Sequence, residues 1–591
     1  MRWPHWPEWW NTVARNAVQT QSPGKGSRFA TLLKVAGSGV LCGVGFGFVM
    51  SIVSNGFVIG VKWLTELREA SPLGIFSIGG KELSLAPLLS LVMAALMILV
   101  VRRIFRISRW HGPADSIYAA HRTDNELDIR SGFGSTLAAF ISASGGASVG
   151  QYGPLVHFGA TMGSFIRRVT GGILTTDVFI GCGVAGAIAA GFNAPIAGVL
   201  FAHEAVLRHF STRSIVPIAL ASVSAVWFSD RLFGVSNILV IDAPSLDMSE
   251  VLPTALVTGP VFGLVAIAFM VAVRRSASFA AQSGWSPTRL VFTAAVMTGI
   301  VGMFVPEILG LGIRPLTEML NGSFDLWFLV LLLVLKVCAT ALCIGFGLFG
   351  GVFSPALFVG GAAGAIGGRL LALLGLTGAS PALAICGMAA VASAVIGAPL
   401  SGVVIVLELT TSYEFALAAM LSVMVSLLIS SQFFGHSFFD RQLADRGIDV
   451  TLGRGHIEMM ETPVAAVVSR EFQKISSESG VDSAIRTMIN ASVTEAYVLD
   501  ASGLFRGKVS LHSLLAGSKT SRIEDLCEAD PLSIKHDASL QQAIEIASRF
   551  VGESIPVINR ETSELLGVVT EADLFQLYLR LQARIADIER S

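Results

Sequence analysis

Ala194-Pro-Ile-Ala-Gly-Val-Leu-Phe-Ala-His-Glu204 returns in nearly the same form as Ala398-Pro-Leu-Ser-Gly-Val-Val-Ile-Val-Leu-Glu408. Both stretches open on Ala-Pro, keep Gly and Val in place and close on Glu, at an offset of 204 residues. A second match upstream, in which Pro154 corresponds to Pro355, has an offset of 201 residues. Close packing of small residues between helices would explain matched glycines, but not the Ala-Pro and Glu positions. The sequence therefore indicates an internal duplication, the usual construction of transporters whose site lies between two repeats.

The composition is that of a membrane protein. Hydrophobic residues make up 53% of the 591 residues, charged residues make up only 14%, and the mean hydropathy is +0.68. A soluble chain carries about a quarter charged residues. The net charge of −1 gives no basis for nucleic-acid binding. Long stretches lack Asp, Glu, Lys and Arg entirely, namely 35–61, 83–101, 131–166, 178–203, 251–273, 337–368, 370–407 and 415–439.

Several of these uncharged stretches are too long for one membrane span and are interrupted by Gly and Pro. One helix needs about 20 apolar residues to cross the bilayer. Non-helical backbone at membrane depth is stable only where it is buried in protein or lines a cavity. We therefore predict a multi-span α-helical membrane domain over 30–450, built from two repeats of short or tilted helices over about 30–232 and 251–435.

The chain changes character after about residue 450. Residues 451–591 are charged and of ordinary hydrophobicity, which predicts a soluble α/β domain. It contains two similar units, about 460–517 and 522–581. In each unit the pattern predicts a helix, two strands joined by a polar turn, and a second helix that begins at Ser or Thr. At the other end, residues 1–29 predict either an arm near the lipid headgroups or a disordered tail, because they carry no cleavable apolar core but four tryptophans, Trp3, Trp6, Trp9 and Trp10.

Two Gly/Pro breaks, Gly150-Gln-Tyr-Gly-Pro154 and Gly350-Gly-Val-Phe-Ser-Pro355, stand at equivalent places in the two repeats. Proline fits the first turn of a helix, and glycine lets the backbone turn and approach closely. The first-turn amides of such a helix have no partner within it, and with the helix dipole they attract an anion without a full positive charge. We predict that the two breaks meet at mid-membrane as a weak anion site, since conduction requires that the ion also leave.

These blocks resemble the CLC family of chloride channels and transporters. Gly350-Gly-Val-Phe-Ser-Pro355 is similar to the family signature GxFxP, and Gly150-Gln-Tyr-Gly-Pro154 stands where the family has G-K/R-E-G-P. The tail units resemble CBS repeats, so that the resemblance covers about residues 30–581. It implies a fold of two inverted repeats with a cytoplasmic CBS pair, assembled as a homodimer in the lipid bilayer, with one path per subunit for chloride or a related monovalent anion. The compact N-terminus favours a bacterial inner membrane.

The resemblance also implies which residues hold the anion. Backbone amides of Gln151, Tyr152 and Gly153 would contribute from the first repeat, and those of Val352 and Phe353 from the second. No cofactor is required for such a path. The six cysteines show no spacing typical of a metal site or a disulfide framework.

Two departures from the family bear on proton coupling. Tyr152 stands where proton-coupled members carry the gating Glu, and Ala205 stands where they carry the inner proton-transfer Glu. A tyrosine hydroxyl, whose ordinary pKa is ~10, does not exchange protons near neutral pH as a shifted Glu does. We therefore predict anion transport without proton coupling, by a channel or an uncoupled carrier with Tyr152 as its gate. His203 and His157 keep a proton-coupled antiporter open as an alternative, although packed, hydrogen-bonded histidines are the simpler interpretation.

The family's two side-chain anion ligands are also missing. The Ser of the GSGIP motif aligns with Pro113 in His111-Gly-Pro-Ala-Asp-Ser116, and the central Tyr aligns with Phe439. Ser116 is the candidate substitute. Lys336 either sets a positive potential along the path or merely snorkels or pairs. Selectivity among chloride, nitrate, bromide and fluoride is left open.

The tail offers a possible nucleotide site. Thr570 and Asp573 match the CBS positions that contact an adenine nucleotide, whereas the first unit has Ser513 in place of the Asp. Binding at one side only and a purely structural tail are both open. A CBS-containing magnesium transporter is the rival class, but hard cations need carboxylate or carbonyl oxygens and the membrane breaks hold few acids. An enzyme is not indicated, because no nucleophile and base pattern appears.

Overall fold

The computed structural model describes residues 25–71, 74–78, 81–122, 125–170, 174–234, 248–375, 380–518 and 520–590. The chain divides into two compact units. The first comprises the chain up to Ala120 together with Leu127–Phe439, and the second comprises His121–Glu126 together with the chain from Asp440 onward. The predicted arm over 1–29, with all four of its tryptophans, lies for the most part outside the described residues.

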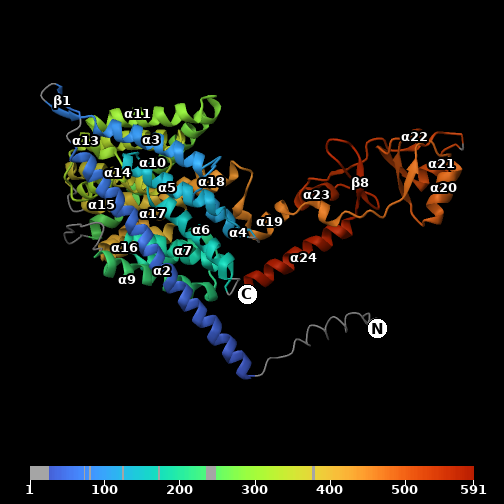
Figure 1. Cartoon of the computed structure of the whole chain (residues 1–591), viewed down its shortest axis with the longest axis horizontal. Coiled ribbons are helices and arrows are strands. Elements are labelled where there is room, and N and C mark those ends of the chain that lie inside the picture. The colour runs from blue at the N-terminus through green and yellow to red at the C-terminus, as the bar shows by residue number, and fades with distance from the viewer. Residues whose placement is uncertain are drawn as a thin grey trace. The chain divides into compact units, whose positions relative to one another are not determined.

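The described part of the first unit consists of helices joined by loops, and its one sheet is a hairpin of β1 (Ile75–Ile78) with β2 (Lys81–Ser84). Figure 1 shows its helices gathered into one block. They are α2 (Lys25–Glu69), α3 (Ala86–Ile104), α4 (Pro113–His121), α5 (Ile129–Gly145), α6 (Tyr152–Thr170), α7 (Thr176–Phe192), α8 (Pro195–Phe201) with the π-helical turn η1 (Ala202–Leu207), α9 (Thr212–Phe233), α10 (Met248–Gln282), α11 (Pro287–Phe304), the 3-10 turn η2 (Pro306–Ile308), α12 (Ile313–Leu320), α13 (Leu326–Gly345), α14 (Phe353–Leu373), α15 (Ser380–Ile396), α16 (Pro399–Thr410), α17 (Tyr413–Phe433) and α18 (Phe438–Ala444).

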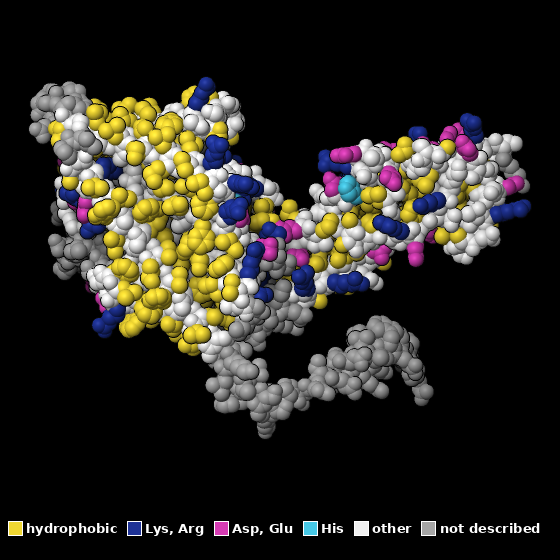
Figure 2. Space-filling view, in the orientation of Figure 1, with side chains coloured by type: hydrophobic (Ala, Val, Ile, Leu, Met, Phe, Trp, Pro, Cys, Tyr) yellow, Lys and Arg dark blue, Asp and Glu magenta, His cyan; other side chains and the backbone are white. Residues whose placement is uncertain are grey.

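The helices of this unit suit a membrane. Within the described residues, eight helices are long and apolar enough to cross it. Between them lie shorter apolar helices, among them Thr176–Phe192 and Pro399–Thr410, which is the alternation of long and interrupted helices predicted from the Gly and Pro breaks. Figure 2 shows hydrophobic side chains over most of the visible face of this unit, with Lys and Arg nearer its margins.

Matching glycines let helices in each repeat pack backbone to backbone. A Cβ on Gly159 of α6 would lie 2.2 Å from the carbonyl oxygen of Gly183 on α7. In the other repeat, a Cβ on Gly360 of α14 would lie 2.2 Å from the carbonyl oxygen of Gly387 on α15. No larger residue fits at such distances, so the matched glycines serve the same helix contact in both halves.

The second unit contains two small sheets of the same design, with strand orders β3-β4-β5 and β6-β7-β8. In each sheet the first pair is parallel and the second is an antiparallel hairpin followed by a helix. The elements are η3 (Val450–Leu452), α19 (Gly453–Glu461), η4 (Val464–Val467), β3 (Lys474–Ser476), α20 (Val481–Asn490), β4 (Glu495–Leu499), β5 (Phe505–Ser510), α21 (Leu511–Ala516), α22 (Ile523–Leu526), β6 (Ile534–Lys535), α23 (Leu540–Ala547), β7 (Ile555–Ile558), β8 (Leu565–Val569) and α24 (Glu571–Arg590).

A polar contact joins the two halves of this unit. Burial raises the pKa of the Tyr497 hydroxyl to about 12, so it stays protonated and donates to the carbonyl oxygen of Ser554 at 2.7 Å. Beside it, Lys508 pairs with Glu495 at 2.6 Å, and both side chains are largely buried. The two halves are therefore held in register by specific hydrogen bonds as well as by their apolar cores.

Candidate anion site

The starts of α6 and α14 are tied together by a short antiparallel bridge. Gly150 N donates to Gly351 O at 2.6 Å, and Gly351 N donates to Gly150 O at 2.7 Å. With the offset of 201 residues, these two glycines are equivalent positions of the two repeats. A reciprocal exchange between equivalent residues is the contact that a two-fold axis between repeats produces. The structure thus brings the two predicted breaks together.

Only glycine fits on either side of this bridge. A Cβ on Gly150 would lie 2.9 Å from both the oxygen of Gly351 and the nitrogen of Ser354. A Cβ on Gly351 would lie 2.9 Å from the nitrogen of Gly153. The absence of side chains is what allows the first turns of both helices to approach the same point.

The residues predicted to offer backbone amides all lie at these two helix starts. α6 begins at Tyr152 and α14 begins at Phe353, so that the positive ends of two long helices converge on the bridge. First-turn amides have no acceptor within their own helix. All five residues are buried, namely Gln151, Tyr152, Gly153, Val352 and Phe353. The site therefore combines unpaired donors with a low-polarity surrounding, in which each donor acts strongly on a negative charge.

An aromatic cluster covers this point. The ring of Tyr152 stacks on Phe192, the last residue of α7, with centroids 3.7 Å apart, and it meets the edge of Phe353 at 5.4 Å. The ring of Phe353 also lies parallel to that of Phe201 at 6.3 Å. The Tyr152 hydroxyl donates to the carbonyl oxygen of Gly191 at 3.3 Å. Tyr152 is thus held in place by both its ring and its hydroxyl.

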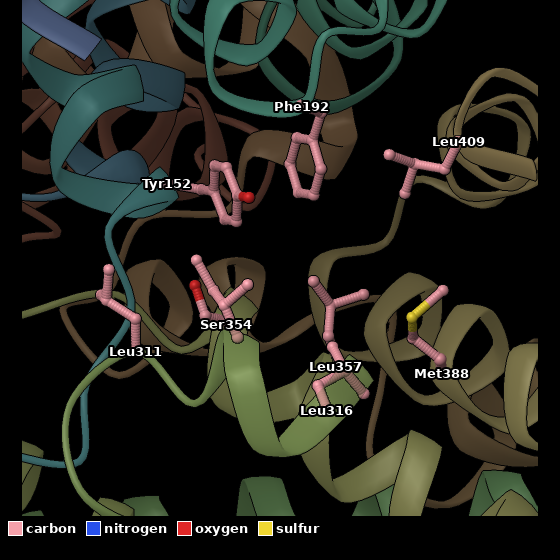
Figure 3. Close-up of a pocket in the computed structure, with 9 residues that line it drawn as sticks. Tyr152, Phe192, Leu311, Leu316, Ser354, Leu357, Met388 and Leu409 are labelled. Carbon is pink, nitrogen blue, oxygen red and sulfur yellow. The ribbon is translucent and has the colours of Figure 1, made fainter. Parts of the chain in front are cut away.

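A small cavity of about 20 Å³ lies against this cluster. It has room for little more than one small molecule or ion. In Figure 3 the rings of Tyr152 and Phe192 lie on one side of it, with Ser354 and Leu357 of α14 across from them. Its lining comes from both repeats and is apolar except at Tyr152 and Ser354; the other lining residues are Leu311, Ile313, Leu316, Met388 and Leu409.

A third helix start, that of α4, also reaches the bridge. A Cβ on Gly153 would lie 3.4 Å from Cγ of Pro113, the first residue of α4. The Gly112 amide at this helix start already has an acceptor, because it donates to Asp115 at 2.9 Å, and Asp115 in turn pairs with Arg109 at 2.6 Å. Pro113 itself has no amide hydrogen to give. The α4 start therefore attracts an anion far less than the starts of α6 and α14.

Ser116 lies deeper in α4 and is committed to another partner. Its hydroxyl is 2.8 Å from Nδ1 of His157 on α6, and both side chains are fully buried. The ring of His157 has a second histidine, His111, at a centroid distance of 6.0 Å. The structure therefore joins the predicted substitute ligand to one of the two candidate proton carriers.

The remaining predicted positions lie apart from the cavity lining. Phe439 of α18 is buried against Phe438 at a centroid distance of 6.1 Å. Ala205 is buried within the π-helical turn η1. His203, in the same turn, hydrogen-bonds through Nδ1 to the carbonyl oxygen of His209 at 2.8 Å and stacks on Phe210. His203 is therefore a packed, hydrogen-bonded histidine, as the simpler interpretation predicted.

Comparison with known proteins identifies the family. Residues 93–431, more than half of the chain, match the family described as voltage gated chloride channel. The chain belongs to this family. A putative chloride channel protein, ClcB-like, from Ralstonia nicotianae is 31% identical to the chain over 352 residues, which cover 58% of this chain and 81% of that protein. An H(+)/Cl(−) exchange transporter, ClcA, from Vibrio vulnificus is 31% identical over 325 residues, which cover 51% of this chain and 67% of that protein.

Solved structures agree on the fold. A slow cyanobacterial Cl−/H+ antiporter covers 69% of this chain and 99% of its own, with a TM-score of 0.60 and 19% identity. A eukaryotic CLC transporter covers 92% of this chain and 98% of its own, with a TM-score of 0.59 and 18% identity. Residues 523–580 match the CBS domain. The predicted class, a multi-pass CLC-type helical membrane domain with a C-terminal CBS region, is confirmed.

Within this CLC fold, the closing Glu of each repeated block caps the start of the other block. Glu204 accepts from the amides of Leu400 and Ser401 at 2.9 and 2.8 Å, and from the Ser401 hydroxyl at 2.6 Å. Glu408 accepts from the amides of Ile196 and Ala197 at 2.9 and 2.8 Å. The short helices α8 and α16 are therefore clasped head to tail by two carboxylates.

From the sequence alone, these two glutamates indicate only the duplication. Their role depends on which helix start each carboxylate meets, and the partners lie about 200 residues away along the chain. The sequence did contain an indication of this role. An acidic residue at the end of an apolar membrane segment is costly unless it is paired, and both blocks end in Glu.

Lys336 on α13 is fully buried and satisfied by the backbone. Its ammonium group donates to the carbonyl oxygen of Ile308 at 2.8 Å and to that of Gly310 at 3.3 Å, and it lies 4.8 Å from the centroid of the Phe358 ring. These contacts hold the loop before α12 against α13 and α14. The pairing that was predicted as one alternative is thus made with carbonyl groups.

In the CBS region, Thr570 and Asp573 form the cap of α24. Oδ2 of Asp573 accepts from the amide and the hydroxyl of Thr570, at 3.0 and 2.6 Å. Asp573 also lines a cavity of about 280 Å³, together with Ala466, Val467, Val468, Gln576, Leu577 and Arg580. In the first half of this region the corresponding pair is Ser510 and Ser513, whose hydroxyls lie 2.8 Å apart. The acid is therefore present on one side only.

Proposed function

We propose that this protein carries monovalent anions, chloride foremost, across a membrane through the point where α6 and α14 meet, without moving protons in exchange. The observation that carries the proposal is the Gly150–Gly351 bridge, which fixes two helix starts from equivalent repeats against one small cavity. Two converging helix dipoles bind an anion, yet weakly enough for it to leave. The relatives named above are a putative chloride channel protein and an H(+)/Cl(−) exchange transporter, which supports the same substrate.

The chemistry of the pathway favours an anion over a cation. Hard cations require carboxylate or carbonyl oxygens. Among the described residues, no group of three or more His, Cys, Asp or Glu side chains is placed to hold a metal ion. The two carboxylates of the α8–α16 clasp are engaged with backbone amides, so they are not free ligands. The magnesium-transporter alternative therefore lacks a site in the part of the membrane unit described.

Tyr152 and Ala205 support an uncoupled mechanism. A proton carrier must change its protonation state within the physiological range, which neither a tyrosine hydroxyl nor a methyl group does. His203 is packed and hydrogen-bonded to a backbone carbonyl group. His157 and His203 are the groups through which coupling would have to run instead, because each has an Nε2 that is buried without a hydrogen-bond partner. Tyr152 acts as the gate, since its ring closes one side of the cavity.

The surroundings of this transport domain follow from the family. We propose a homodimer with one pathway per subunit in a bacterial inner membrane, with the CBS region in the cytoplasm. The mass of the purified protein in detergent, measured by light scattering, checks the oligomeric state. A mass of one subunit would contradict it.

The CBS region is proposed to bind an adenine nucleotide in the 280 Å³ cavity that Asp573 lines. Both hydrogen bonds of the Asp573 carboxylate use Oδ2, which leaves Oδ1 as an acceptor for a ribose hydroxyl. Arg580 at the same cavity offers a positive charge for phosphate. Because the first half has Ser513 in place of the acid, we expect a single nucleotide per CBS pair.

The deciding experiment is ion flux from liposomes that contain the purified protein. Chloride efflux and external pH are recorded together after a chloride gradient is imposed. Chloride efflux with no change in pH supports the proposal. Proton movement in fixed ratio to chloride contradicts the uncoupled mechanism and directs attention to His157 and His203, whereas the absence of any halide or nitrate flux contradicts anion transport itself.

A matched variant sharpens this test. Tyr152→Glu restores the family's gating acid but leaves Ala205 in place of the inner one. We therefore expect no proton movement in this variant either, because a proton would have no second carrier. Chloride-driven proton uptake by Tyr152→Glu would show that one acid is enough and would overturn the argument from Ala205.

A further inference from the structure

Ser354 has a buried hydroxyl without a partner beside the bridge. The residue is 4% exposed, and its Oγ is buried with no hydrogen-bond partner. It belongs to the first turn of α14, a helix of 21 residues. A polar atom left unsatisfied in an apolar interior costs about 1–3 kcal/mol. A buried polar atom that no protein group satisfies calls for a partner from outside the chain, such as an ordered water or a ligand.

The position of this hydroxyl is set by the bridge. A Cβ built on Gly150 would lie 3.0 Å from Ser354 Oγ and 2.9 Å from Ser354 N, so the hydroxyl and its own amide lie side by side at the convergence of the two helix starts. Ser354 also lines the cavity that Tyr152 and Phe192 cover (Figure 3). The Ser354 hydroxyl is thus a hydrogen-bond donor beside the same cavity that the positive end of α14 faces.

The two other hydroxyl groups considered at this site already have hydrogen-bond partners. Ser116 is hydrogen-bonded to His157, and the Tyr152 hydroxyl donates to Gly191. Pro113 and Phe439 carry no side-chain donor at all. Ser354 therefore supplies the hydroxyl that the rest of the site lacks.

We propose that the Ser354 hydroxyl is a direct ligand of the transported anion and the main side-chain determinant of its affinity. This inference rests on the proposed transport function and names a residue within it. The ligand is a monovalent anion of the size of chloride or bromide, which accepts a hydrogen bond from Oγ while the first-turn amide of the same residue contributes from the backbone.

The test measures chloride binding to the full-length protein in detergent by isothermal titration calorimetry, from a buffer based on a large organic anion. A hydrogen bond to a charged partner is worth enough that Ser354→Ala should weaken chloride binding about tenfold. Ser354→Thr, which keeps the hydroxyl, should restore the affinity to within roughly threefold. The control is Ser54→Ala on α2, which removes another buried serine hydroxyl that lacks a partner and does not line the cavity.

Equal affinity in Ser354→Ala and Ser54→Ala would overturn the assignment. So would a bromide-soaked crystal whose anomalous peak lies outside hydrogen-bonding distance of Ser354 Oγ. If the wild-type protein conducts chloride in liposomes while Ser354→Ala binds and conducts equally well, this inference fails and the proposed function stands. If the wild-type protein neither binds nor conducts chloride, the proposed function fails and takes this inference with it.

Discussion

The two helix starts at the centre of the membrane unit share one backbone and differ in their side chains. The bridge glycines Gly150 and Gly351 exchange hydrogen bonds as equals. The residues two and three positions further on still correspond between the repeats, but their side chains differ. Tyr152 corresponds to Phe353, and Gly153 corresponds to Ser354. One repeat thus provides a cover and the other provides a buried donor. The backbone contact is therefore symmetric between the two helix starts, while the side chains next to it are not.

The clasp between α8 and α16 also combines a symmetric backbone contact with a small difference in side chains. Each glutamate accepts from two amides of the opposite repeat, but Glu204 also accepts from the hydroxyl of Ser401, where the equivalent residue for Glu408 is Ala197. A symmetric contact is therefore slightly stronger on one side. Substitutions at equivalent positions measure how far the symmetry extends.

The bridge should show the largest effect and no difference between repeats. Both Gly150→Ala and Gly351→Ala force a Cβ to within 2.9 Å of backbone atoms, so we expect each to cost at least roughly 3 kcal/mol of stability and more than tenfold in anion flux. Thermal unfolding in detergent and liposome flux measure the two quantities. Gly367→Ala, at a place on α14 with open space around it, is the control. A large effect at only one bridge glycine would break the symmetry argument.

The clasp should show the next largest effect, with a difference between its two halves. Glu204→Gln disturbs three hydrogen bonds and Glu408→Gln disturbs two. Hydrogen bonds to charged groups are worth about 2 kcal/mol, so we expect Glu204→Gln to lose roughly that much and Glu408→Gln to lose less. Thermal unfolding provides the ranking, with the exposed Glu66→Gln as control. The reverse order would show that the Ser401 hydroxyl adds nothing.

Tyr152 is the position at which loss of the side chain should raise the flux. Removing the ring with Tyr152→Ala abolishes its stacking on Phe192, a contact worth about 1 kcal/mol beyond burial, and opens one side of the cavity. We therefore expect chloride flux to rise roughly tenfold, since 1.4 kcal/mol shifts a closed-to-open equilibrium by that factor. Tyr152→Phe keeps the ring and should leave flux nearly unchanged. Unchanged flux in Tyr152→Ala would remove this residue from the gate.

Substitutions at the equivalent residues Asp573 and Ser513 of the CBS region should differ least in their effects. Asp573→Ala removes the carboxylate's two hydrogen bonds at the cap of α24 and should cost about 1 kcal/mol, whereas Ser513→Ala removes only a contact between two hydroxyls. Calorimetry of the full-length protein with and without ATP checks both effects. ATP should raise the unfolding temperature of the wild type and of Ser513→Ala but not that of Asp573→Ala. An equal rise in all three would place the nucleotide elsewhere or make the binding independent of the acid.

The sequence by itself determined the class of protein, and it predicted the two repeats and the two helix starts of the candidate site. Composition and uncharged stretches predict a membrane domain because the bilayer tolerates few charges. The Gly/Pro breaks predict helix starts because proline and glycine act locally on the backbone. The Ala-Pro…Glu blocks predict two repeats because their spacing is visible along the chain. Each of these conclusions rests on residues that are close together in sequence or compared by position alone.

Only the tertiary structure decided which polar groups meet. In the folded chain, Ser116 is hydrogen-bonded to His157, and Asp115 accepts from the Gly112 amide at the start of α4. Glu204 accepts from amides at a helix start about 200 residues away in the sequence. The tertiary structure also left the Ser354 hydroxyl without a partner beside the cavity. Hydrogen bonds act over about 3 Å and depend on direction, so their pairing is fixed by the packing of distant helices and not by local sequence.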